Sequence, residues 1–220
     1  MPRLSLPDGL VRIPGPRLPL SLDDAQRVVT EARANTVVLV EGWSDQAAVE
    51  TLAHRVGLNL AAMAIVVLPI GGATNALQFA ARFGSQGLRL RLAGLYDAPE
   101  ERHFLRAVCG GMVTSAPSRT DAETLGFYAC SEDLEGELIR ALGPEAVEQI
   151  IAAEGEMGAF RRFQGQPAQL GRPLDAHLRR FLGTRAGRKI RYGLLLAAAL
   201  DLRNMPSPLS RLLSRLTSSR

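Results

Sequence analysis

The stretch VVLVEGWSDQAAVETLA, at residues 37–53, contains the change of pattern that decides the fold. Residues 37–41 form a run of apolar and β-branched side chains that ends in the carboxylate of Glu41, which is typical of a buried strand. Apolar side chains at helical spacing then predict a helix over residues 46–56. The stretch therefore predicts a strand that brings Glu41, with Asp45 close behind it, to the carboxyl end of a parallel sheet, where open α/β sheets bind ligands.

Two residues between the strand and the helix favour a sharp turn. Gly42 leaves room for the approach of backbone or ligand, and we expect it to adopt a positive φ. Ser44 is the expected N-cap of the helix. The same residues also fit an ordinary strand-to-helix turn with solvated acids, so this stretch alone leaves both interpretations open.

Strand and helix patterns continue to alternate as far as residue 142. Such an alternation predicts an α/β fold, with a parallel sheet of about four strands and helices on both faces. Ser131 is the expected N-cap of the last helix before residue 142. The further predicted strands span residues 64–69, 90–97 and 127–130, and the helices between and after them span residues 74–83, 98–108 and 132–142.

Composition divides the chain into three parts. Residues 1–20 contain five prolines and predict an extended arm, residues 21–142 predict the α/β domain, and residues 143–220 predict a helical basic extension. Residues 1–154 contain 13 arginines against 19 acids, whereas residues 155–220 contain 13 basic residues against three acids, giving net charges of −6 and +10. The basic part fits a polyanion such as nucleic acid, or else a solvated arginine-rich tail.

Carboxylates follow three of the four predicted strands, and the carboxyl ends of parallel strands share one edge of the sheet. Four or five carboxylates that converge there would repel one another unless a cation neutralised them. Oxygen ligands suit a hard ion such as Mg²⁺ or Mn²⁺, and such a site beside a polyanion-binding surface indicates phosphodiester chemistry. The acids are Glu41 and Asp45 after the first strand, Asp97 and Glu100 after the third, and Asp133 and Glu135 after the fourth.

The sequence also argues against several protein classes. No segment approaches 18 uninterrupted apolar residues, and the first residues lack the apolar core of a signal peptide, so we expect no membrane span. Two cysteines, Cys109 and Cys130, are too few for a disulfide framework and lack metal-ligand spacing. We therefore expect reduced thiols in a cytoplasmic protein.

The order of these motifs resembles a TOPRIM domain, the metal-binding module of topoisomerases, bacterial primases, recombination proteins and OLD-family nucleases. The shared pattern is strand-Glu-Gly-x-x-Asp at residues 41–45, a Gly-Gly turn after the second strand, and a third strand that ends in Asp97. Among these groups the chain is most similar to the OLD (overcoming lysogenization defect) nucleases. They share the acid at Asp45 and a later Leu-Glu pair, here containing Glu135.

The resemblance implies roles for particular residues. It implies that Mg²⁺ or Mn²⁺ is held by Glu41, Asp45, Asp97 and Glu135, with Glu41 also acting as a general base. It implies tight turns that keep the site open at Gly42, Gly71 and Gly72.

The chain departs from the family pattern in three ways. The usual Asp-x-Asp is Asp97-Ala98-Pro99 here, so either Glu100 replaces the second aspartate or one metal site is weak. No GxxxxGK[ST] motif is present, so the chain resembles the stand-alone actinobacterial TOPRIM proteins that lack the ATPase domain. The family's late basic residue has no certain counterpart, and Lys189 is the candidate for a catalytic role. The residues expected to grip nucleic acid are Arg185, Arg188, Lys189 and Arg191.

Two functions remain open from the sequence. The first is a Mg²⁺- or Mn²⁺-dependent nuclease that cleaves nucleic acid, with DNA favoured over RNA. The second is a non-catalytic TOPRIM module that binds nucleic acid or a separate protein partner. The sequence leaves the oligomeric state undecided.

Overall fold

The computed structural model describes residues 20–109 and 117–218, so the predicted arm at residues 1–20 lies outside the described part except for Leu20. A four-stranded parallel sheet with the strand order β2-β1-β3-β4 forms the centre of the protein. Four parallel strands confirm the predicted α/β class. The strands are β1 (Thr36–Val40), β2 (Ile65–Pro69), β3 (Arg91–Asp97) and β4 (Phe127–Cys130).

Strand β1 lies in the interior of the sheet and pairs with β2 on one side and with β3 on the other. Successive side chains of a strand point to opposite faces. Val37 and Leu39 contribute to the core on one face, and Val38 and Val40 to the core on the other. All four side chains are fully buried, which explains why the strand reads as an unbroken apolar run.

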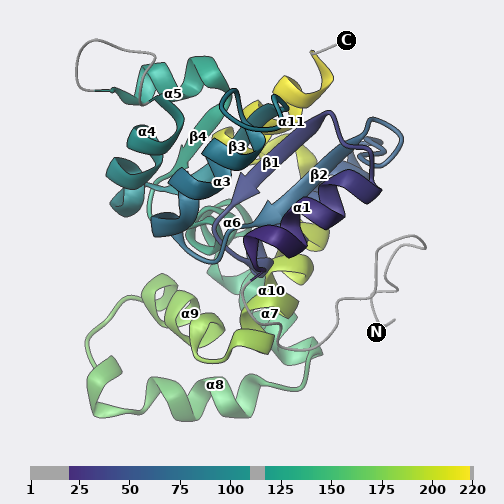
Figure 1. Cartoon of the computed structure of the whole chain (residues 1–220). Coiled ribbons are helices and arrows are strands. Elements are labelled where there is room, and N and C mark those ends of the chain that lie inside the picture. Colours follow the sequence, from purple (N-terminus) through teal and green to yellow (C-terminus); the bar gives the residue numbers. More distant parts are fainter. Residues whose placement is uncertain (1–19, 110–116, 219–220) are drawn as a thin grey trace.

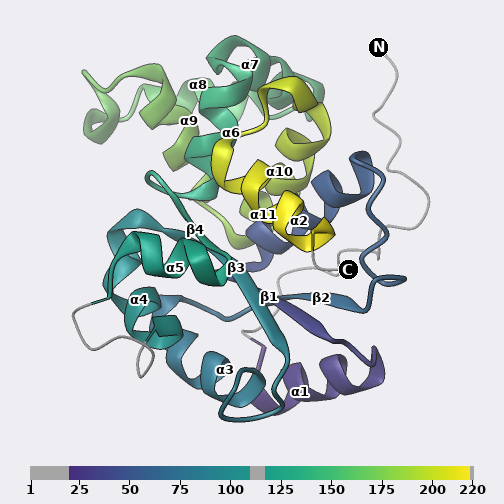
Figure 2. The same ribbon diagram turned by 90° about the horizontal axis from the view of Figure 1, so that it is seen from above.

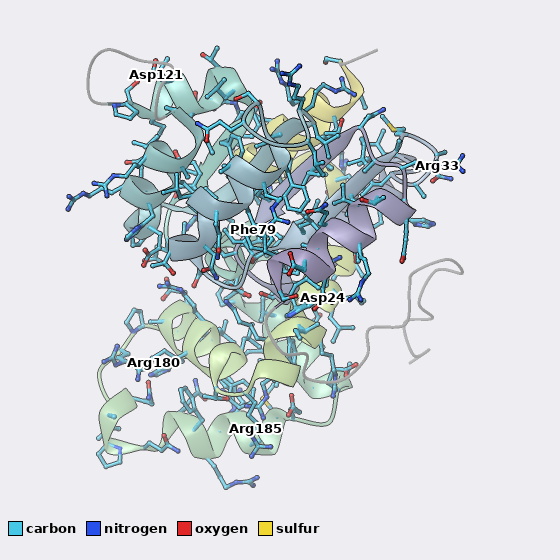
Figure 3. All side chains as sticks on the ribbon, in the orientation of Figure 1. Asp24, Arg33, Phe79, Asp121, Arg180 and Arg185 are labelled. Carbon is cyan, nitrogen blue, oxygen red and sulfur yellow. The ribbon has the colours of Figure 1, made fainter. Side chains whose placement is uncertain are left out.

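The first face of the sheet is covered by helices that lie between residues 22 and 125 (Figure 2). Aromatic side chains dominate this core, with Phe79 of α3 (labelled in Figure 3) fully buried and Tyr96 of β3 stacked on Phe104 of α4 at 5.2 Å between ring centroids. The helices are α1 (Leu22–Glu31), α3 (Ala76–Phe83), α4 (Glu101–Cys109) and α5 (Arg119–Leu125). The sequence patterns did not predict α5.

The second face is covered by α2 (Trp43–Arg55) together with helices that follow residue 133 (Figures 1 and 2). Leu196 of α10 and Leu212 of α11 belong to the same buried cluster as Val38 and Val40 of β1. The predicted basic extension therefore helps to build the core of the α/β fold. Its helices, with the last helix of the predicted α/β part, are α6 (Leu134–Leu142), α7 (Pro144–Ala153), α8 (Met157–Gln164), α9 (Leu174–Gly183), α10 (Ala186–Ala199) and α11 (Ser207–Thr217).

Short 3₁₀ turns connect several of these elements. One of them, η2, follows β3 directly and replaces the first turn of the helix predicted from residue 98. Within the described residues no helix is long and apolar enough to cross a membrane. The 3₁₀ turns are η1 (Ala73–Asn75), η2 (Ala98–Glu100), η3 (Pro167–Gln169) and η4 (Leu202–Asn204).

Gly94 in β3 allows the sheet and its aromatic cover to pack closely. A Cβ atom at this position would lie 2.3 Å from the carbonyl oxygen of Leu39 and 2.9 Å from a ring carbon of Phe127. The backbone oxygen cannot move away without disturbing the pairing of β1 with β3.

We predict that Gly94→Ala lowers the free energy of unfolding by about 3 kcal/mol or more, because overpacking a close-packed core typically costs 1–3 kcal/mol. Thermal unfolding followed by circular dichroism measures the change as a fall of roughly 6–12 °C in Tm. The matched control is Gly183→Ala at the end of α9, where no described heavy atom lies within 4 Å of the added Cβ. A Gly94→Ala protein as stable as this control would contradict the observed strand register.

Candidate metal centre at the carboxyl edge of the sheet

Glu41 lies at the end of β1, and the neighbouring strands hold it in place. Its carbonyl oxygen accepts hydrogen bonds from Gly71 N and Gly72 N at 3.0 and 3.1 Å, which joins the turn after β2 to the turn after β1. These glycines have φ values of 73° and 110°, a conformation that side chains disfavour. Asp97 N, at the end of β3, donates to Glu41 Oε1 at 3.3 Å. The carboxylate is thereby fixed between two strand ends.

The turn between β1 and α2 differs from the sequence expectation. Helix α2 begins at Trp43 with Gly42 as its N-cap, so the predictions of Ser44 as N-cap and of a start at residue 46 were wrong. The predicted positive φ at Gly42 was also wrong, because φ is −144° and ψ is 179°, an extended conformation open to any residue.

Asp45 stabilises the first turn of α2 and faces the other acids. Gly42 N donates to Asp45 Oδ2 at 2.7 Å, so the aspartate caps one of the unpaired N–H groups at the helix start. The side chain is buried. An aspartate that only capped the helix could remain in solvent. Asp45 is instead enclosed in the fold beside other carboxylates.

The third strand contributes Asp97 and, after it, Glu100. Asp97 ends β3 in register with Cys130, which ends β4. Glu100 lies in η2 with its side chain 45% exposed, and its carboxylate is 3.8 Å from His103 Nε2. The negative charge of Glu100 contributes to raising the pKa of Glu41, after the larger effect of burial. Glu100 thus lies at the solvent-exposed rim of the acid group.

Glu135 of α6 and Lys189 of α10 meet although 54 positions separate them in the sequence. Lys189 Nζ lies 3.4 Å from Glu135 Oε2, and the Glu135 side chain is only 4% exposed. Neither Glu135 oxygen has a hydrogen bond of good geometry with a described residue, although Ser44 lies close enough to lower the pKa of Glu135. A buried carboxylate without hydrogen bonds is unfavourable, so a further cation beside it would be stabilising.

The pKa values show that these acids form one electrostatic group. Burial, followed by the charge of Glu135, raises the pKa of Asp45 to about 7. Burial, followed by the charges of Glu41 and Asp45, raises the pKa of Asp97 to about 9. Burial also raises the pKa values of Glu41 and Glu135. The ionised forms of all four acids are thus disfavoured in the folded protein.

Lys189 partly offsets this negative charge. Burial lowers its pKa, but the nearby charges of Glu135 and Asp45 outweigh burial, and the pKa of Lys189 is raised. In turn, the ammonium group opposes the rise in the pKa values of Glu41, Asp45 and Glu135. The sequence-predicted Lys189 therefore lies within the acid group.

Two further residues complete this site: Asp133, which the sequence placed among the acids after the fourth strand without a specific role, and Arg179, which the sequence did not single out. Asp133, rather than the predicted Ser131, is the N-cap of α6 and accepts a hydrogen bond from Gly136 N at 2.8 Å. Arg179 of α9 donates from Nε to Asp133 at 2.6 Å and forms an ion pair with Glu132 at 3.1 Å. The position of Asp133 after a strand was a usable signal, whereas the contribution of Arg179 depends on tertiary structure alone.

The other basic residues predicted to grip nucleic acid have different surroundings. The guanidinium of Arg188 forms an ion pair with Glu156 at 2.8 Å, lies 4.1 Å from the ring centre of Phe181, and is 9% exposed. Arg188 is thus engaged within the protein, and its contact with nucleic acid stays a prediction that these contacts disfavour. Arg191 forms an ion pair with Glu154, and Arg185 is exposed at the start of α10, on the helical side of the molecule (Figure 3).

The carboxylate oxygens are of the kind that a hard divalent cation prefers. In the described residues, however, they are too far apart to coordinate one ion together. The acids offer carboxylate oxygens only, and the buried oxygens of Glu135 have no hydrogen bond of good geometry with a described residue. No group of three or more His, Cys, Asp and Glu side chains in the described part of the chain is close enough to hold a metal ion as it stands. The chemistry of the residues fits Mg²⁺ or Mn²⁺, and side-chain rotation would be needed to enclose the ion.

The fold and its acids define an α/β domain with a group of buried carboxylates at one edge of a parallel sheet. Residues 34–98 match the family described as "Overcoming lysogenization defect protein-like, TOPRIM domain". This stretch of the chain is therefore an OLD-like TOPRIM domain, as its motifs predicted.

Solved structures of OLD proteins share the wider fold. The C-terminal region of the Xanthomonas campestris pv. campestris OLD protein is 22% identical, with a TM-score of 0.66 over 85% of this chain and 94% of that chain. The C-terminal region of the Burkholderia pseudomallei OLD protein is 19% identical, with a TM-score of 0.64 over 84% of this chain and 98% of that chain. A search of curated protein sequences finds no match. TOPRIM domains generally bind divalent metal ions and act on nucleic acid, and the domain at residues 34–98 implies a module of this type.

We predict that the metal-free protein becomes less stable as the pH rises from 5 to 9. The pKa of Asp97 is raised from 3.8 to about 9 on folding, so the folded state retains a proton that the unfolded state releases in this window. The stability that protonated Asp97 contributes is thus fully present below the pKa of the unfolded chain, 3.8. It is lost as the pH rises towards and through the pKa of the folded protein, about 9. Chemical unfolding in EDTA should show that Asp97→Asn reduces the slope of this loss, by up to about 1.4 kcal/mol per pH unit.

The control for this measurement is Asp201→Asn. The hydrogen bond from Arg203 lowers the pKa of Asp201, so this group titrates below the window. Wild type and Asp201→Asn should show the same slope between pH 5 and 9. An Asp97→Asn protein with that slope too would mean that Asp97 is ionised in the metal-free fold.

Proposed function

We propose that this protein is a Mg²⁺- or Mn²⁺-dependent nuclease that hydrolyses phosphodiester bonds, with DNA as its preferred substrate. The observation that carries the proposal is the buried Glu135 carboxylate, whose oxygens have no hydrogen bond of good geometry and lie 3.4 Å from Lys189 Nζ, in an OLD-like TOPRIM fold. A structural acid in a core would be hydrogen-bonded, so this arrangement favours a site adapted to a further cation and a phosphate.

The proposed metal ligands are the buried acids of the three strand ends. Glu41, Asp45, Asp97 and Glu135 have raised pKa values in the fold, so replacing protons by a divalent ion would relieve their mutual repulsion. Glu100 lies at the rim and would supply the carboxylate that Pro99 cannot. When bound, the metal would polarise the phosphate and lower the pKa of water.

The proposed roles of the chain's own groups follow from their surroundings. Burial raises the pKa of Glu41, which makes this carboxylate a stronger base than a solvated one and suits it to accept a proton from water. The Lys189 side chain is 42% exposed, so its ammonium can also reach a phosphate oxygen at the mouth of the site. Its positive charge would stabilise the charge that develops on the phosphate in the transition state.

Nucleic acid would approach over the helices beyond the carboxyl edge of the sheet. Arg180 and Arg185 lie on this part of the molecule (Figures 1 and 3), are exposed, and form no ion pair with a described residue. Arg191 pairs with Glu154, but exposed ion pairs contribute little stability and exchange readily for phosphate. Arg180, Arg185 and Arg191, with Lys189, are thus the proposed phosphate contacts, and Arg188 is not.

A non-catalytic module that binds nucleic acid or a protein partner is the second candidate. It is favoured by Pro99 in place of the second family aspartate, and by the absence of a closed metal-holding group among the described residues. Such a module would retain the positive surface while binding metal weakly or with a single ion.

Cleavage assays test the proposal directly. We predict that the purified protein cuts supercoiled plasmid or single-stranded DNA in Mn²⁺ or Mg²⁺, more slowly cuts RNA, and cuts nothing in EDTA. Glu41→Gln and Asp97→Asn should lower the rate by about 10²-fold or more, because each removes a group that acts at the reacting phosphate. Asp201→Asn, with the same loss of charge at an exposed site, should cleave as wild type does.

The same assay distinguishes the two candidates. If Glu100 supplies the missing carboxylate, Glu100→Gln abolishes cleavage, whereas if the second site is merely weak, Pro99→Asp increases it. Binding of every substrate without cleavage in Mn²⁺ by wild type, Pro99→Asp and Glu100→Gln alike would refute the nuclease and leave the binding module.

A further inference from the structure

Helix α10 approaches the first turn of α2 most closely at Gly193. A Cβ atom at this position would lie 2.6 Å from the carbonyl oxygen of Ser44 and 3.2 Å from its Cα and carbonyl carbon. All three atoms belong to the backbone, so no side-chain rotation could relieve the clash. Figure 2 shows α10 running alongside α2 on the second face of the sheet.

A glycine inside this helix is unfavourable on local grounds. Gly193 lies in the interior of a 14-residue helix, where glycine costs about 1 kcal/mol relative to alanine. Its flanking residues Tyr192 and Leu194 are buried and typical of a packed helix. The close contact with Ser44 supplies the steric reason for glycine at this position.

The contact lies between two groups of the proposed site. Ser44 directly precedes Asp45, and both side chains are buried in the first turn of α2. Lys189 lies four residues before Gly193, so the two residues share a face of α10. Lys189 Nζ lies 3.4 Å from Glu135 of α6, and Glu135 in turn interacts with Ser44, the residue that Gly193 contacts. The separation of α2 and α10 at Gly193 therefore bears on how Lys189 meets this group of acids.

Other contacts of α10 restrict how it could adjust. Arg55, at the end of α2, donates from Nη1 to the carbonyl oxygens of Ala197 and Leu200 at 2.8 and 2.6 Å. Arg188 ties the start of the helix to Glu156. Between these two attachments, a larger residue at position 193 would push α10 away from α2. Lys189 lies one turn before position 193, inside the segment between the attachments, so its side chain would shift relative to the acids.

We propose that Gly193 is a positioning residue, which places Lys189 against the buried acids by allowing α10 to approach Ser44. The role of Lys189 at the phosphate rests on the proposed nuclease function, but the positioning itself does not. Because the displacement of a catalytic group by about 1 Å can cost on the order of 10²-fold in rate, Gly193→Ala should lower cleavage by a similar factor.

The test uses the fact that Lys189 is the only lysine in the chain. In protein labelled with ¹³C-lysine, the ε-methylene group of Lys189 gives one side-chain NMR signal. Glu135→Gln removes the charge beside Lys189 and should shift that signal in the wild-type background. In the Gly193→Ala background the shift caused by Glu135→Gln should be largely lost, because Lys189 no longer contacts residue 135.

The matched control is Gly187→Ala, the same change in the same helix, where no described heavy atom lies within 4 Å of the added Cβ. Its response to Glu135→Gln should equal that of wild type. If Gly193→Ala does not fold alone, it is made in a Gly183→Ala, Gly187→Ala background, since both changes favour helix.

Each outcome has a defined meaning. An unchanged response to Glu135→Gln in Gly193→Ala would overturn the proposal, whatever the cleavage assay shows. Failure to fold in the stabilised background would also overturn it, because Gly193 would then serve the fold as a whole. A lost response with no cleavage by any variant would support the positioning role and reject the nuclease function.

Discussion

Repulsion among buried carboxylates at the carboxyl edge of the sheet is the constraint on which the rest of this structure depends. Three parallel strands end at the same edge, and each is followed by an acid that the fold encloses. The pKa values of Asp45 and Asp97, about 7 and 9, show how strongly the fold disfavours their charge. Solvated acids would suffice to end strands, so the concentration of this cost at one place supports the proposed cation site.

Basic side chains of the helices after residue 143 partly neutralise these acids. Lys189 reaches Glu135 from α10, and Arg179 reaches Asp133 from α9. The same helices bury apolar side chains against the second face of the sheet, so the sheet and the late helices share one core. The opposite net charges of the first and last parts of the sequence are therefore partly explained by ion pairs between them within the protein. Arg180 and Arg185, which form no such ion pair with a described residue, remain for an external polyanion.

Much of the fold could be predicted because its signals are local. The apolar runs that became β1 and β3 end in Glu41 and Asp97, and parallel strands must place such ends at one edge. Helix α7 opens the extension that was predicted to be helical, and Pro144 at its first position marks its start in the sequence. The start of α2 was mispredicted, because the helix begins at Trp43, before the apolar side chains at helical spacing that were used to predict it.

The parts of the site that escaped prediction depend on contacts between distant residues. Arg188 reads as a free cation in the sequence, but it meets Glu156 and Phe181 only after α8, α9 and α10 have packed. The same holds for Arg179 and Asp133, which are 46 positions apart. Nothing in the sequence indicated that position 193 requires glycine, because the requirement comes from the close approach of the Ser44 backbone in another helix.

Calorimetric titration of Mn²⁺ into the metal-free protein tests most directly whether the enclosed acids form a cation site. We expect saturable binding in the wild type and in Asp201→Asn, and a loss of at least about tenfold in affinity in Glu135→Gln, since that change removes the most deeply enclosed of the proposed ligands. Equal affinities in all three proteins, or no binding at millimolar Mn²⁺, would contradict the account.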